Sequence, residues 1–128
     1  MKKVKINNKQ IKGEADLNYD AKTDALYVYA KDVKYVESID LNDVILDIGE
    51  DGIIKGIEIL NVSKKFHVDK YDLKHIKKLN AEIEITPDII TIKITISILK
   101  RNKTVEKQTF AKGLNDISLD SGIVSMEC

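Results

Sequence analysis

The chain has 128 residues, of which 43% are hydrophobic and 33% are charged, as is typical of a single globular domain. Basic and acidic side chains balance at 21 each, so no overall field favours nucleic acid or an anionic membrane as a partner. Cys128 is the only cysteine, which excludes a disulfide framework, and the sequence shows neither a signal peptide nor an apolar run of membrane-spanning length. We therefore expect a cytoplasmic protein that binds no cofactor.

The first third of the chain carries the alternating pattern of β-strands. Apolar and polar residues alternate over residues 14–20, and residues 25–30 are apolar on both sides, so these two segments are predicted to pair. Residues 34–41 predict a third strand, and residues 2–12 a short N-terminal hairpin. Isoleucine is abundant and tryptophan is absent, which favours a core of β-branched side chains.

A glycine-centred hairpin is predicted from Val44 to Ser63. Two runs rich in isoleucine flank the tetrapeptide Gly49-Glu50-Asp51-Gly52. Glycine can adopt the positive φ that a tight turn requires, so the turn residues agree with the strand pattern on either side.

The segment between residues 64 and 79 predicts one or two short helical turns. Asp69 stands at a position suited to an N-cap, and Leu73, Ile76 and Leu79 follow at helical spacing. We expect this helix to bury Leu73 and Ile76 and to expose its lysines.

A long amphipathic hairpin is predicted from Ala81 to Leu99. Isoleucines alternate with polar residues on both sides of a turn at Pro87-Asp88, which places Ile85 opposite Ile90, Ile83 opposite Ile92 and Glu82 opposite Lys93. The last elements that the pattern predicts are strands at residues 105–110, 117–119 and 123–126, with a break at Lys112-Gly113.

These elements predict an α+β fold dominated by antiparallel sheet. We expect a single domain over residues 1–128, with a β-hairpin half at 1–63 and a short helix plus antiparallel half at 64–128. Charge is divided unevenly between the halves: twelve acids and four lysines lie between Glu14 and Glu58, whereas Lys64 to Lys78 holds six lysines and two aspartates. This polarity is compatible with solvated surfaces or with self-association through opposite charges.

Two motifs in the first half resemble a known prokaryotic family. The run Y-D-A-K-T-D-A-L-Y-V-Y, Tyr19 to Tyr29, and the run D-I-G-E-D-G-I-I-K-G-I-E-I-L-N-V-S, Asp47 to Ser63, are similar to the domain of unknown function 2283 over roughly residues 16–63. Many relatives have D-x-D-x-D-G where this chain has D-I-G-E-D-G, so Gly49 replaces one acid. The family has no established activity, and the resemblance implies at most an interaction role.

The acids of the glycine-centred hairpin are candidate cation ligands. Counted from Asp47, a calcium-type loop would use Asp47, Asp51 and Glu58, although Gly49 supplies no carboxylate and strands flank the loop. Glu58 lies in an apolar run, where burial would raise its pKa and allow acid or base catalysis, or it points outward on the wet face of its strand.

Aromatic residues give the other candidate site. Tyr19, Tyr27 and Tyr29 are predicted to form either an interaction patch or a covered sheet face. The leading hypothesis is a non-enzymatic module that self-associates or holds a small protein partner. The alternatives are a divalent-cation binding protein and a small enzyme that uses Glu58.

Overall fold

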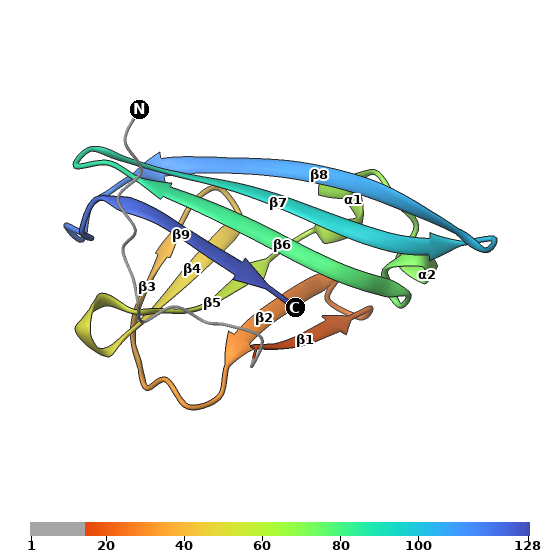
Figure 1. Cartoon of the computed structure of the whole chain (residues 1–128), viewed down its shortest axis with the longest axis horizontal. Helices are drawn as coiled ribbons and strands as arrows, with labels where there is room; N and C mark the ends of the chain where they lie inside the picture. Colours follow the sequence, from red (N-terminus) through yellow and green to blue (C-terminus); the bar gives the residue numbers. More distant parts are fainter. Residues whose placement is uncertain (1–14) are drawn as a thin grey trace.

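The computed structural model describes residues 15–128 as two antiparallel β-sheets stacked face to face. Figure 1 shows β8, β7, β6 and β9 as one layer and the five N-terminal strands as the other, with both helices towards the end where β7 turns into β8. This arrangement confirms the predicted β-dominated fold. The hairpin predicted at residues 2–12 lies outside the described residues.

The N-terminal sheet has the strand order β1-β2-β5-β4-β3. Its strands are β1 (Ala15–Asp20), β2 (Ala25–Ala30), β3 (Tyr35–Asp40), β4 (Val44–Gly49) and β5 (Ile54–Ile59). β1 pairs with β2 as predicted, and β4 pairs with β5 across the 3-10 turn η1 (Glu50–Gly52), which confirms the glycine-centred hairpin. Gly52 has the positive φ expected of that turn, whereas Gly49 has a φ of −100°.

The C-terminal sheet has the order β8-β7-β6-β9. Its strands are β6 (Ile76–Ile85), β7 (Ile89–Lys100), β8 (Lys103–Leu114) and β9 (Gly122–Glu127). The three predicted cross-strand pairs of the long hairpin, Ile85 with Ile90, Ile83 with Ile92 and Glu82 with Lys93, are all confirmed.

The predicted strand break at Lys112-Gly113 is wrong. β8 continues through both residues to Leu114. A Cβ atom on Gly113 would lie 2.6 Å from Cδ2 of Leu41, so this glycine lets the turn between β3 and β4 pack against the inner face of β8. Close packing, rather than chain reversal, requires the glycine.

The strand predicted at residues 117–119 is also wrong, because a side chain holds this segment as a loop. The Asn115 amide nitrogen donates to the carbonyl oxygens of Thr86 and Leu119, each at 3.0 Å, and its oxygen accepts from the Leu119 amide at 2.9 Å. Local hydrogen bonds from asparagine compete with a sheet ladder in this way.

Two short helices connect the sheets, as predicted, but at shifted positions. They are α1 (Val62–Phe66) and α2 (Lys70–Leu73). Leu73 is buried in α2 as expected, and Asp69 is the residue before that helix. Ile76 and Leu79 instead belong to β6, where Leu79 pairs with Ile96, because sheet pairing overrides their helical spacing.

The inner faces of both sheets share one core. Its centre is the inward row of β7, where Ile90, Ile92, Ile94, Ile96 and Ile98 are all at most 2% exposed. Both helices contribute to the same cluster through Phe66 and Leu73. Within residues 15–128, no helix has the length and apolar character needed to cross a membrane.

Candidate functional site

Two of the three tyrosines predicted to form a patch lie on the outer face of the N-terminal sheet. Tyr27 and Tyr29 alternate with the buried residues Leu26 and Val28 on β2, and both rings are half-buried. Tyr19 pairs with Leu26 and packs against the core on the opposite side of the sheet. The structure therefore does not bring Tyr19 to the face that Tyr27 and Tyr29 share.

Tyr19 instead belongs to a buried hydrogen-bonded clamp. Its hydroxyl donates to Oδ1 of Asp24 at 2.9 Å, while the Ser63 hydroxyl donates to Oδ2 of Asp24 at 2.6 Å. The Ser63 amide also donates to this carboxylate, at 3.2 and 3.3 Å. These contacts join the turn between β1 and β2 to the start of α1.

The clamp changes the acidity of both of its ionisable groups. Burial alone would raise the pKa of Asp24, but hydrogen bonds from Ser63 and Tyr19 outweigh it, so the pKa is lowered. Burial and the neighbouring carboxylate raise the pKa of the Tyr19 hydroxyl. Asp24 is thus a satisfied buried carboxylate with a structural role, which the sequence pattern did not reveal.

Asp47 and Glu58, both predicted cation ligands, do meet on the outer face of the N-terminal sheet. Glu58 on β5 lies between Tyr27 of β2 and Ile45 of β4 in the ladder. Partial burial, a hydrogen bond with Asp47 and the charge of Asp47 raise the pKa of Glu58 to about 7. Glu58 therefore titrates near neutral pH in the folded chain.

The acid pair extends towards β3 through hydroxyl groups. Ser38 donates from Oγ to Oδ1 of Asp47 at 2.7 Å, and the Tyr35 hydroxyl lies 2.8 Å from the same Oγ. Asp51 lies in η1, and its side chain is outside the described residues. Among the side chains that the structure does describe, no group of three or more histidines, cysteines or acids is placed to hold a metal ion.

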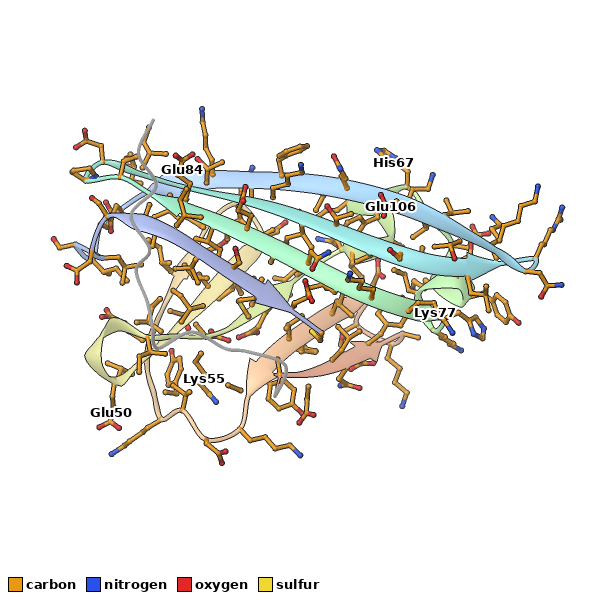
Figure 2. The ribbon with its side chains drawn as sticks, viewed as in Figure 1. Glu50, Lys55, His67, Lys77, Glu84 and Glu106 are labelled. Atoms are coloured by element: carbon orange, nitrogen blue, oxygen red, sulfur yellow. The ribbon has the colours of Figure 1, made fainter. Side chains whose placement is uncertain are left out.

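The outer face of the C-terminal sheet is a regular grid of side chains that sequence reasoning did not single out. Its central row, taken across β9, β6, β7 and β8, is Ser125, Glu82, Lys93 and Phe110. The rows on either side follow the same ladder: Glu127, Asn80, Thr95 and Gln108 on one side, and Ile123, Glu84, Thr91 and Lys112 on the other. Figure 2 places Glu84 and Glu106 on this sheet, across the molecule from Glu50 and Lys55.

Four large apolar side chains are exposed on this face. Phe110 and Leu114 are each 64% exposed, Leu99 on β7 is 40% exposed, and Ile89, which pairs with Leu114, is 38% exposed. A signal for them was present in the sequence, since Phe110 and Leu114 are in phase with the polar residues Glu106 and Gln108 along β8.

The charged side chains of this face form no salt bridge with one another. Within residues 15–128 the ion pairs closer than 4 Å join Lys31 to Asp16, at 3.1 Å, and Lys100 to Asp72, at 3.3 Å. Glu82 and Lys93 are therefore cross-strand neighbours whose charged ends remain available to another molecule.

The predicted basic segment gathers at the end of the molecule where α2 lies (Figure 1). A cleft of about 300 Å³ beside it is lined by His67, Asp69, Asp72, Lys100 and Lys107, together with apolar residues. A second cleft of similar size lies between β1 and α2, and its lining includes Leu17, Tyr19 and Leu73. Neither of these two clefts includes Glu58.

Comparison with known proteins identifies a matching family model and similar chains. The family model described as protein of unknown function, DUF2283, matches residues 17–63. An uncharacterised protein of Methanocaldococcus jannaschii is 45% identical over 109 residues, which cover 84% of this chain and 94% of that protein. A protein of Methanosarcina mazei named "Putative hypoxanthine phosphoribosyltransferase" is 45% identical over 102 residues, or 80% of this chain and 83% of that protein. No solved structure matches the chain.

Proposed function

The chain belongs to the DUF2283 family, whose description assigns no chemistry, and from its geometry we propose that it is a non-enzymatic protein-interaction module. The binding surface is the outer face of the C-terminal sheet. The observation that carries this proposal is the exposure of Phe110, Leu114 and Ile89 on that face.

Exposed aromatic and aliphatic side chains are favourable only when another surface covers them. Isolated apolar residues on a protein surface need no explanation, but here Leu114 and Ile89 are direct cross-strand partners, and Phe110 lies on the same strand and face as Leu114. Phenylalanine is enriched at the centre of interfaces because it buries a large area with little loss of conformational freedom.

The sheet edges offer a weaker route to assembly. On the edge strand β3 the register shifts between Tyr35 and Glu37, and the strand carries the exposed acids Glu37 and Asp40. Bulges and charges of this kind prevent an edge from pairing with another strand. α1 contacts β8, the edge strand of the other sheet. These features favour a sheet face as the interaction surface.

Site-specific photo-crosslinking tests this function. A photoreactive phenylalanine analogue at position 110 should crosslink to a protein in the cells that make this chain. The matched control is the same analogue at Tyr71, which is 68% exposed on α2 and should not crosslink to a protein. A crosslink at position 27 without one at position 110 would place the interaction on the outer face of the N-terminal sheet, where Tyr27 lies. Absence of a protein crosslink at both positions would refute the proposed interaction function.

A second candidate function is divalent-cation binding, favoured by the proximity of Asp47 and Glu58. A cation would bind between these two carboxyl groups, with Ser38 as a neighbouring hydroxyl. Millimolar calcium should then raise the melting temperature of the wild type and leave that of Glu58→Gln unchanged. Equal melting curves with and without calcium for the wild type would exclude this function.

A further inference from the structure

We infer that the partner of the C-terminal sheet is a second copy of this chain, packed face to face across a two-fold axis that runs parallel to the strands between β6 and β7. This inference rests on the proposed function, since it names the occupant of the same surface. It follows from the order of charges across the sheet.

Around its centre the outer face divides into an acidic half and a basic half, whereas the next row has Lys78 on β6 and Glu106 on β8. In the three central rows, the β6 and β9 half carries Glu82, Glu84 and Glu127, whereas the β7 and β8 half carries Lys93 and Lys112. Two faces with this division attract each other only when the acidic half of one lies over the basic half of the other.

The proposed axis produces that arrangement. A two-fold rotation about a line between β6 and β7 keeps each row at its own level and places β6 over β7 of the second copy, and β8 over β9. Glu82 then meets Lys93 of the second copy, and the contact occurs twice. Phe110 lies over the small side chain of Ser125, so a large residue meets a small one.

The proposed axis pairs opposite charges, whereas several other two-fold axes in the plane of this face pair like charges. An axis perpendicular to the strands places Glu82 on its own copy when it runs through the row of Glu82, and on Glu84 when it runs between the rows of Glu82 and Glu84. A parallel axis that lies along β6 also stacks Glu82 on itself. Like-charge contacts of this kind oppose association, whereas the axis between β6 and β7 places Glu82 against Lys93.

The face is close in size to one side of a standard dimer interface. Its strands β6, β7, β8 and β9 have 10, 12, 12 and 6 residues, which at about 3.4 Å per residue and about 4.8 Å per strand gives a projected area of about 650 Å². Each partner in a standard interface buries roughly 800 Å². Sheets that pack in this aligned way keep their strands within about 30° of parallel.

Charge reversal tests the axis directly. Glu82→Lys places two lysines against each other at both symmetric contacts, and Lys93→Glu places two glutamates there. Each single variant should raise the dimer dissociation constant at least tenfold in sedimentation equilibrium, and the double variant should return it to within threefold of wild type. Glu106→Lys, on the same face beyond the end of β9, is the matched control and should change it less than threefold.

Mixing the two single variants gives the sharpest result. Neither variant should dimerise well alone, yet the mixture should form a heterodimer with two attractive contacts. At one contact the two substituted side chains meet with opposite charges, and at the other the unchanged Lys93 of one chain meets the unchanged Glu82 of the other. Failure of the mixture to assemble, or wild-type affinity in either single variant, would overturn the axis. A wild type that stays monomeric, while position 110 crosslinks to a different protein, would overturn the inference and leave the proposed function intact.

Discussion

The raised pKa of Glu58 beside Asp47 predicts a pH-dependent stability that one substitution should abolish. Glu58→Gln replaces a titrating carboxyl with a neutral amide of the same shape, which can still donate a hydrogen bond to Asp47. The wild type and this variant should therefore have similar free energies of unfolding at low pH and different ones at high pH.

The sign and size of the effect follow from linkage. The pKa of Glu58 is raised from 4.5 to about 7 in the folded chain, so the folded state binds more protons than the unfolded state between these values. The contribution is fully present below pH 4.5 and is lost as the pH rises through 7. At about 1.36 kcal/mol per pH unit the upper limit is about 3.4 kcal/mol. Because this sheet face is open to solvent, screening reduces the expected loss to about 1–2 kcal/mol.

Urea unfolding from pH 4.5 to 8.5 measures this difference. We expect Glu58→Gln to be more stable than the wild type by about 1–2 kcal/mol at pH 8 and equal to it near pH 4.5. The exposed control Glu106→Gln should follow the wild-type curve across the range. Parallel curves for the wild type and Glu58→Gln, or a less stable variant at pH 8, would refute the raised pKa of Glu58.

Three further substitutions test the clamp, a sheet contact and the core. Asp24→Ala removes the acceptor of Tyr19 and Ser63 and puts alanine at a φ of 54°, so chemical denaturation should show a loss of about 3–4 kcal/mol. A Cβ on Gly56 would collide with the Val28 carbonyl oxygen and lie 3.0 Å from Cα of Tyr29, so Gly56→Ala should lower stability by about 1–3 kcal/mol. Its control Gly52→Ala, at a positive φ in open space, should cost about 1 kcal/mol in the same assay. Ile94→Ala should cost about 2–5 kcal/mol by thermal or urea unfolding, and a loss below about 1 kcal/mol would place Ile94 outside the core.

The sequence determined the strand pairs wherever one face of a strand is buried. Register has a period of two residues, so the isoleucines of β7 specify their partners on β6 without any long-range information. The glycine-centred hairpin was predictable for the same reason. Ile76 and Leu79 were assigned wrongly because their spacing fits both a helix and a strand, and only the ladder with β7 distinguishes them.

Candidate site residues were less predictable, because their roles depend on contacts distant in the chain. Asp47 and Glu58 are eleven residues apart and meet only through the register of β4 and β5. Ser63 reaches Asp24 across 39 residues, so no local pattern indicates the clamp. The uninterrupted length of β8, which places Phe110 and Leu114 on the outer face, depends on Gly113 fitting beneath Leu41.

The mass of the unmodified chain in solution tests the central claim most directly. Light scattering after size exclusion, over a wide range of protein concentration, should show twice the chain mass at high concentration. Phe110→Asp, which puts a charge in the central row of the proposed face, should give the mass of one chain throughout. A wild type of single-chain mass at every concentration, or a Phe110→Asp variant with the wild-type mass, would contradict assembly through the outer face of the C-terminal sheet.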